Sequence, residues 1–361
     1  MRVVDFSRVL AGPLVAMTLG DLGADVVKVE SPLGDDTRRW KPPQDALGRA
    51  SYHHTANRNK RSIALDLKQE LDLELARRLC AGADVVVSNF LPGTLERFGL
   101  DHDTVAAGNP GVVHCEISGF GEAAGARLPG YDPLVQALSG LMSVTGPPGH
   151  PSKTGVAVTD VVAALYATIA VLAALHVRRD TGRGQRVTID LLHASLALLA
   201  NQSTGYLASG EVPVALGNVH PSIEPFATYA AADGDLMICA GNDAQFRRLA
   251  ETVGLDEDGR FATNELRVAN REALRHLLES RLATRPRAEW ADLLSSAGVP
   301  AGPVQTIDQA FSLAERLGLE VVDETDGVRT VAFPAHLSAT PATVRLRPPD
   351  LDEHGGELRS G

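Results

Sequence analysis

One carboxylate precedes a long apolar run. The segment GVAVTDVVAALYATIAVLAALHV, residues 155 to 177, carries Asp160 directly before an uncharged series of residues. Asp is a preferred helix N-cap, where its carboxylate accepts hydrogen bonds from free backbone N–H groups. The same position would lower the pKa of a carboxylate and keep it ionised, and an ionised carboxylate in a dry site can attack an activated acyl group. The pattern alone leaves both the cap and the nucleophile open.

Glycines upstream of this carboxylate favour acyl chemistry. The segment SGLMSVTGPPG, residues 139 to 149, contains glycines whose backbone N–H groups could approach a carbonyl oxygen closely. If Asp160 attacks a thioester, we expect this segment to bind the oxyanion that forms.

Other catalytic signatures are missing from the sequence. The turn FSRVLAGP, residues 6 to 13, lacks the GxGxxG pattern of dinucleotide sites, and Ser152 stands where a phosphate-binding loop needs glycine. Neither GxSxG nor HExxH occurs. His53 and His54 are adjacent, so their side chains would diverge on a strand or a helix and could not share a metal. We therefore expect no metal and no permanently bound cofactor.

The elements that must position Asp160 alternate between strands and helices. Residues 2–6 and 24–30 read as strands around a helix at 12–23, and the pattern continues with strands at 61–67, 84–90 and 111–118 and a helix at 69–83. Apolar strands separated by helices predict a buried parallel sheet covered on both faces. We predict a large Rossmann-like α/β domain whose ligands bind at the carboxyl ends of the strands.

The pattern of predicted elements changes near residue 218. The segment PFATYAAADGDLMICAG, residues 225 to 241, reads as two strands around an Asp-Gly turn, and helical patterns follow at 242–254 and 270–285. We therefore expect three parts: residues 1–217 as the main part of the large domain, 218–315 as a smaller α+β domain, and 316–361 as a C-terminal segment returning to the large domain.

Composition excludes several partners. The net charge of −11 and the 4% aromatic content disfavour nucleic-acid binding. Three widely spaced cysteines (Cys80, Cys115 and Cys239) indicate neither a disulfide framework nor a zinc knuckle, which fits a reducing cytoplasm. Polar residues interrupt the apolar start of the chain, so no signal peptide is predicted. The apolar stretch Val161 to Val177 is shorter than a membrane span and is predicted to be a buried helix.

Several blocks resemble one enzyme family in order and in residue type. They are VVDFSRVLAGPLVAMTLGDLGADVVKVE, NRNKRSIALDLK, SNFLPGTLERFGL, GYDPLVQALSGLMSVTG, TGRGQRVTIDLLHASL and AGVPAGPV. These blocks are similar to the signature blocks of the family III CoA-transferases, the CaiB/BaiF family, and the similarity extends from residue 2 to about residue 345. The resemblance implies that the chain moves coenzyme A from an acyl-CoA to a free carboxylic acid, with both acting as substrates. Asp160 matches the family's nucleophilic aspartate, which becomes an aspartyl-CoA thioester during the reaction.

The same resemblance implies contacts to coenzyme A. Residues matching the family's segments for the adenine and phosphate end are Leu65, Lys68, Asn89, Phe90 and Arg97, and Tyr131 is expected to bond or pack against the acyl-CoA. One departure is Leu10, which stands where formyl-CoA transferases of the family carry Gln. That side chain's oxyanion contact cannot be transferred to this chain.

Two alternatives stay open. Racemases of the family that act on 2-methylacyl-CoA carry His in a GHD block, whereas this chain reads GYDP, and an unperturbed Tyr131 with a pKa near 10 is a poor base. A racemase or epimerase is therefore the less favoured enzyme, and a non-catalytic CoA-binding protein is the other alternative. From the family we also expect an intertwined homodimer.

Overall fold

The computed structural model describes residues 1 to 360, which form two compact units. The first unit contains residues 1–142 and 153–212 and the chain from Gly318 onward. The second contains residues 143–152 and 213–317. The division found in the structure is thus near residues 212 and 317. The boundaries expected from the sequence, 217 and 315, stay a prediction.

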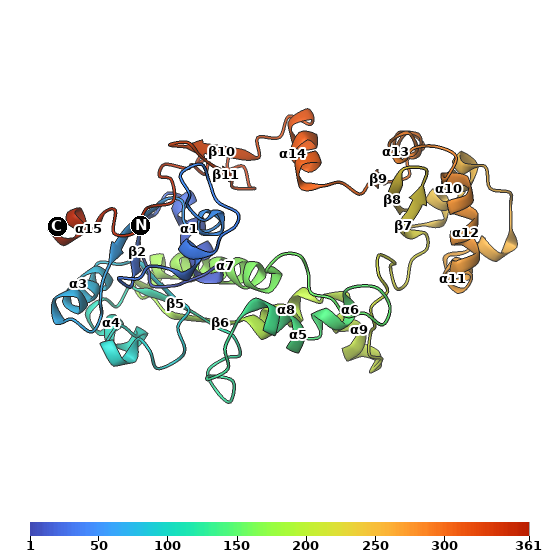
Figure 1. Cartoon of the computed structure of the whole chain (residues 1–361). Coiled ribbons are helices and arrows are strands. Elements are labelled where there is room, and N and C mark those ends of the chain that lie inside the picture. The colour runs from blue at the N-terminus through green and yellow to red at the C-terminus, as the bar shows by residue number, and fades with distance from the viewer. Residues whose placement is uncertain (361) are drawn as a thin grey trace. The chain divides into compact units, whose positions relative to one another are not determined.

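A six-stranded parallel sheet forms the centre of the first unit, in the order β3-β2-β1-β4-β5-β6 (Figure 1). Its strands are β1 (Arg2–Asp5), β2 (Asp25–Glu30), β3 (Lys60–Ala64), β4 (Val85–Ser88), β5 (Val113–Ser118) and β6 (Arg186–Asp190). In the middle of the sheet Val3 pairs with both Val26 and Val85, so β1 lies between β2 and β4. The chain moves outward from β1 in one direction and later from β4 in the other. The carboxyl ends of β1 and β4 are therefore the switch point where ligands of such sheets bind.

The strands are valine-rich because the sheet is buried on both faces. Side chains of successive strand residues point to opposite faces. Accordingly Val3 packs in one apolar cluster with Ala11 and Ala163, whereas Val4 packs in the other with Leu73 and Leu75. The predicted parallel α/β sheet with helices on both faces is confirmed.

Helices cover the two faces and connect the strands. The helices of the first unit and its borders are α1 (Ala11–Asp21), η1 (Asp36–Arg39), α2 (Ser51–His54), α3 (Glu70–Ala81), η2 (Glu96–Phe98), α4 (His102–Gly108), α5 (Asp132–Leu138), α6 (Leu141–Val144), α7 (Val158–Thr181), α8 (Leu191–Leu198), α9 (Asn201–Ser209) and α15 (Gly355–Ser360). A hairpin of β10 (Val322–Thr325) and β11 (Val328–Val331) precedes the C-terminal segment. That segment then packs against β3, where the His354 N–H donates to the Ser62 carbonyl at 3.0 Å.

Helix α7 is long and apolar enough to cross a membrane by length and composition alone. In the structure one of its faces is part of the core, where Ala163, Ala167 and Val171 pack with Val15 and Leu19 of α1. The buried helix predicted for residues 161–177 is therefore confirmed on this face. Its other face is exposed, with Leu165 and Ile169 more than half accessible.

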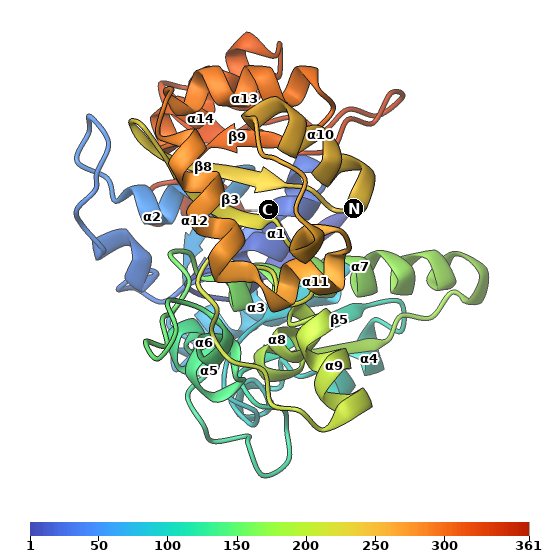
Figure 2. The ribbon, with the colours of Figure 1, turned by 90° about the vertical axis from the view of Figure 1, so that its right-hand side faces the viewer.

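The second unit has an antiparallel sheet in the order β7-β8-β9 (Figure 2). Its elements are β7 (Phe226–Ala231), β8 (Gly234–Cys239), α10 (Asp243–Val253), η3 (Gly259–Phe261), α11 (Asn264–Ala269), α12 (Arg271–Leu282), α13 (Arg287–Ser296), β9 (Ala301–Pro303) and α14 (Ile307–Arg316). The β7–β8 hairpin turns tightly, with Ala231 opposite Gly234, so its two-residue turn is Ala232-Asp233, one residue before the predicted Asp-Gly turn. Tyr229 and Leu236 of the sheet pack with Leu249, Leu278 and Trp290 of the helices.

Candidate active site

Asp160 lies in the first turn of α7 and is 8% exposed. It is not the N-cap of the helix, because that position is Ala157 and the helix has no side-chain cap from it. No described residue donates a hydrogen bond to the Asp160 carboxylate. The interpretation of Asp160 as a helix cap is therefore wrong.

The start of α7 is held instead by Asp132, the first residue of α5. Its Oδ1 accepts hydrogen bonds from the Thr159 N–H at 2.9 Å and from the Thr159 hydroxyl at 2.5 Å. Its Oδ2 accepts from the Gln136 side-chain amide at 2.7 Å. Asp132 thus performs the capping that the sequence assigned to Asp160. The Asp160 carboxylate is left unbonded.

Burial raises the pKa of Asp160 to about 7, and the nearby charge of Asp132 adds to the effect. The expectation that the helix start lowers this pKa is wrong, since desolvation and a like charge both favour the protonated form. Near neutral pH, the carboxyl therefore exists in both forms. An ionised fraction with a high pKa is a stronger base and nucleophile than an ordinary surface aspartate.

A cavity of about 70 Å³ opens at Asp160. Its lining comes from the first unit and consists of Ala11, Asn89, Phe90, Leu91, Pro92, Ile117, Ser118, Gly119, Gly121, Gly125, Ala126, Leu128, Gly130, Asp160 and Leu191. Ala11 follows β1 and Asn89 follows β4, so the cavity lies at the switch point of the sheet. The glycines that line it belong to the loop after β5. None comes from residues 139–149, so the structure does not place the expected segment at this cavity.

Gly119 and Gly130 close this loop at its base. A Cβ on Gly119 would lie 2.4 Å from the Gly130 Cα, and one on Gly130 would lie 2.5 Å from the Gly119 Cα. Only glycine at both positions permits so close an approach of the two backbones. Both residues line the cavity at Asp160, so the close approach shapes its wall.

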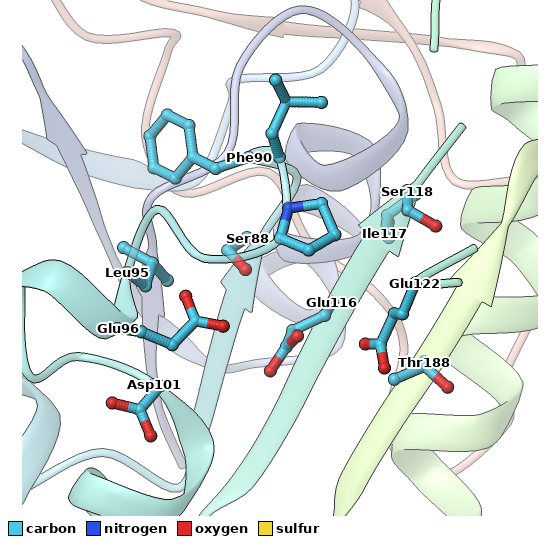
Figure 3. A pocket seen from close by; sticks show the side chains of 12 residues that line it. Ser88, Phe90, Leu95, Glu96, Asp101, Glu116, Ile117, Ser118, Glu122 and Thr188 are labelled. Carbon is cyan, nitrogen blue, oxygen red and sulfur yellow. The ribbon is translucent and has the colours of Figure 1, made fainter. Parts of the chain in front are cut away.

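A second, smaller cavity adjoins the first and shares Phe90, Leu91, Pro92, Ile117 and Ser118 with it (Figure 3). In Figure 3, Glu96 and Asp101 approach from the segment after β4, and Glu116 lies on β5. Burial alone would raise the pKa of Glu116, but the close contact with His114 and the hydrogen bonds from Arg186 outweigh burial and hold the pKa at about 2. Glu116 is therefore ionised and paired with Arg186 at 2.6 Å, which reduces its repulsion of an anionic ligand.

Two of the residues expected to contact coenzyme A line the cavity at Asp160. They are Asn89 and Phe90. The side-chain amide of Asn89 binds the backbone of Arg8 on both sides, accepting from its N–H at 2.8 Å and donating to its carbonyl at 2.7 Å. The guanidinium of Arg8 lies over the Phe90 ring, 5.4 Å from its centroid. The segment after β4 is thus fastened to the loop after β1.

The structure does not bring the other expected contacts into this cavity. Lys68 and Arg97 are exposed, and Tyr131 is 61% exposed although its neighbour Gly130 lines the cavity. Leu65 is buried in the core, so any contact it makes with coenzyme A would use its backbone. The assignment of these four residues to coenzyme A stays a prediction.

Sequence reasoning missed two residues beside Asp160. Asp132 stands in the GYDP block, where attention went to its neighbour Tyr131, although an Asp two residues after a Gly and just before a Pro is itself a typical helix start. Tyr52 was not considered. Burial raises the pKa of its hydroxyl, as do the charges of Asp160 and Asp132, which places Tyr52 within electrostatic range of both carboxylates.

Comparison with known proteins relates the whole chain to one group. The model of CoA-transferase family III matches residues 1–355. A succinate–glutarate CoA-transferase from Agrobacterium fabrum is 41% identical, over 99% of this chain and 94% of its own length. An acetyl-CoA:oxalate CoA-transferase from Acetobacter aceti is 36% identical, with the same coverage of both chains. Among solved structures, a CaiB/BaiF family protein from Brucella suis superposes with a TM-score of 0.91 at 44% identity, covering 100% of this chain and 97% of that one.

Proposed function

Because the chain belongs to the family III CoA-transferases, which move coenzyme A between acids, we propose that it does so through a covalent aspartyl-CoA thioester on Asp160. The observation that carries this proposal is the Asp160 carboxylate itself. It is buried at the switch point, lines a cavity and receives no hydrogen bond from any described residue. A carboxylate used only for structure would be paired, because an unpaired buried charge is costly.

The first half of the reaction loads coenzyme A onto the enzyme. An Asp160 oxygen attacks the donor's thioester carbonyl, and the carbon–sulfur bond breaks to give a mixed anhydride and a CoA thiolate. The thiolate then attacks the aspartyl carbonyl of the anhydride. The donor acid leaves as a free carboxylate, and Asp160 carries coenzyme A as a thioester.

The second half reverses these steps with the acceptor. The acceptor carboxylate attacks the aspartyl thioester, which releases the thiolate and forms a second mixed anhydride. The thiolate attacks the acceptor's acyl carbonyl, so acyl-CoA departs and the Asp160 carboxylate is regenerated. Each C–S bond that breaks is replaced, which conserves the thioester energy without a further reagent.

The surroundings of Asp160 suit this chemistry. The first N–H groups of helix α1 have no partners within the helix, and Ala11 at its start lines the cavity. Such a helix start stabilises developing negative charge on a thioester oxygen. The raised pKa of Asp160 increases the nucleophilicity of its ionised form.

We propose small dicarboxylic acids as acceptors, since the relatives named for succinate, glutarate and oxalate align over nearly the whole chain. The test is a transfer assay with succinyl-CoA and either glutarate or oxalate, following acyl-CoA products by mass spectrometry. Wild type should form glutaryl-CoA or oxalyl-CoA, and Asp160→Asn should lose at least about 10³-fold in kcat. Retention of wild-type kcat by Asp160→Asn would overturn the aspartyl mechanism. The racemase alternative is not favoured, and an α-carbon exchange assay in D₂O would reveal it.

We also propose a homodimer. The support is the exposed apolar face of α7, which contains Leu165, Tyr166, Ile169, Leu172 and Val177. Several exposed apolar side chains on one helix face are typical of a protein interface. A second copy of the chain is the partner that the family resemblance implies.

A further inference from the structure

The loop between β1 and α1 contains a strained residue. Val9 has a φ of +69°, a left-handed conformation that β-branched side chains rarely adopt. Two residues later, Ala11 lines the cavity at Asp160. Strain of this kind persists only where the surrounding structure enforces it, and it collects at functional sites.

A hydrogen bond to the Asp35 carboxylate holds Val9 in this conformation. Its carboxylate accepts the Val9 N–H at 3.2 Å and the Thr37 N–H and hydroxyl at 3.0 and 2.8 Å. The Nζ of Lys28 donates to the Asp35 Oδ2 at 3.1 Å and to the Ser7 carbonyl at 3.0 Å. The side chains of Lys28 and Asp35 are both fully buried. One buried ion pair thus forms hydrogen bonds to the loop at both Ser7 and Val9.

A second buried lysine holds the first turn of α1, directly after the loop. The Nζ of Lys60 donates to the Pro13 carbonyl at 2.8 Å, to the Asp5 Oδ2 at 2.8 Å and to the Asn57 Oδ1 at 3.0 Å. Asn89 in addition binds the backbone of Arg8. The backbone from Ser7 to Pro13 is therefore held at Ser7, Arg8, Val9 and Pro13 by the side chains of Lys28, Asn89, Asp35 and Lys60.

Gly12 shows how tightly the loop is folded. A Cβ at this position would lie 2.3 Å from the Ser7 Cβ, so the start of α1 packs directly against Ser7. Ser7 is also the residue whose carbonyl accepts the hydrogen bond from Lys28. Rotation of Val9 to an ordinary conformation would change the path of the chain between these two residues. Ala11 and its N–H would then leave their place in the wall of the cavity that Asp160 also lines.

A buried ion pair is a poor choice for stability alone. Desolvating two charges is costly, and apolar residues of similar volume often serve a core as well or better. The pair places a hydrogen-bond acceptor, the Asp35 carboxylate, opposite the Val9 N–H. Without this acceptor, Val9 would adopt the negative φ that β-branched residues prefer. The arrangement is directional, and apolar packing could not replace it.

We propose that Asp35, held by Lys28, is a positioning residue for the transferase reaction. It keeps Val9 in the left-handed conformation and so presents the start of α1 to the acyl-CoA thioester. The inference rests on the proposed function for the step that it serves. Its effect on the binding of an acyl-CoA does not require turnover.

The test uses two substitutions and their combination. Asp35→Asn removes the charge that accepts the Val9 N–H, and Val9→Gly removes the steric penalty of positive φ. We expect Asp35→Asn to weaken succinyl-CoA binding, measured by calorimetry, and to lower kcat/KM at least tenfold. Adding Val9→Gly should restore most of both losses, because glycine adopts the loop conformation without being forced. Asp21→Asn, at a buried ion pair with Arg58 at the other end of α1, is the matched control.

A purely structural role predicts a different pattern. Asp35→Asn and Asp21→Asn would then lower the melting temperature alike, with no selective loss of acyl-CoA affinity. Adding Val9→Gly would restore the melting temperature of neither variant. That outcome overturns the proposal. If Asp35→Asn does not fold, Val9→Pro replaces it, since proline fixes φ near −65° and removes the N–H that Asp35 accepts, while the Lys28–Asp35 ion pair stays in place. It should reproduce the loss of affinity, and wild-type affinity in Val9→Pro contradicts the inference. A wild-type enzyme that binds succinyl-CoA but transfers nothing would refute the proposed function alone.

Discussion

The Asp132 carboxylate accepts hydrogen bonds from both the backbone N–H and the hydroxyl of Thr159, the residue directly before Asp160. Asp132 therefore anchors the start of α7 and at the same time places a like charge near Asp160. Because Asp132 accepts the hydrogen bond from the backbone at the start of α7, the Asp160 carboxylate is not needed as a cap and is available to react. Because the satisfying group is a carboxylate, the pKa of Asp160 is raised further.

This relationship predicts the pH dependence of the reaction. Only ionised Asp160 attacks the thioester, and burial together with Asp132 raises its pKa to about 7. The kcat/KM for the acyl-CoA donor should thus rise with pH and level off above an apparent pKa near 7. Asp132→Asn keeps an oxygen for Thr159 but removes the charge, so its acid limb should move to lower pH. A profile that is flat from pH 5 to 9 in wild type, or unchanged in Asp132→Asn, would contradict the assignment.

The same pKa predicts how stability changes with pH. The native state binds the Asp160 proton more tightly than the unfolded chain, whose Asp has a pKa of 3.8, so this group becomes increasingly destabilising between about pH 4 and pH 7. Asp160→Asn should raise the free energy of unfolding at pH 8, by at most about 4 kcal/mol, and less at pH 5. Urea denaturation at both pH values measures the difference. Equal gains for Asp160→Asn at both pH values would refute the raised pKa.

The glycine pair at the base of the loop after β5 offers a test of the cavity wall. In Gly119→Ala the new Cβ meets the Gly130 Cα, so the two backbones must separate. We expect the KM for acyl-CoA to rise several-fold, with a loss of stability of about 1–3 kcal/mol from the overpacked contact. Gly121→Ala has no neighbour near its new Cβ but has a φ of +75°, so it controls for backbone strain in the same loop. Equal effects of both variants on KM would show that the close approach does not shape the cavity.

The exposed face of α7 predicts the state of assembly. Leu165→Glu together with Ile169→Glu places two charges on this face, and burying them in an interface would be costly. Light scattering at micromolar concentration should find a dimer for wild type and a monomer for the double variant. Leu71→Glu, on the exposed surface of α3, should remain dimeric. A wild-type monomer would disprove the homodimer.

The sequence predicted the sheet well because its strands are buried on both faces. Valine-rich strands such as β2 and β4, separated by helices, allow few other folds. Asp160 was found from its place in the family's block. Its pKa was misjudged because the carboxyl is buried and because the cap of α7 comes from Asp132, 28 residues upstream, and no local pattern indicates either.

Long-range contacts also explain what the sequence could not reveal about the loop after β1. Val9 is an ordinary residue in the sequence, and its left-handed conformation follows from Asp35 and Lys28, which lie on a different strand and turn. The domain boundaries, the cytoplasmic location and the contacts of Leu65, Lys68, Arg97 and Tyr131 with coenzyme A stay predictions.

The most direct test of the aspartyl mechanism is the intact mass of the protein after incubation with succinyl-CoA and hydroxylamine. Hydroxylamine cleaves both an anhydride and a thioester at the activated carbonyl, leaving a hydroxamate about 15 Da heavier than the free carboxylate. We expect this adduct on wild type, mapped to Asp160 by peptide sequencing and absent from Asp160→Ala. An adduct on another residue, or active enzyme that never forms one, would contradict it.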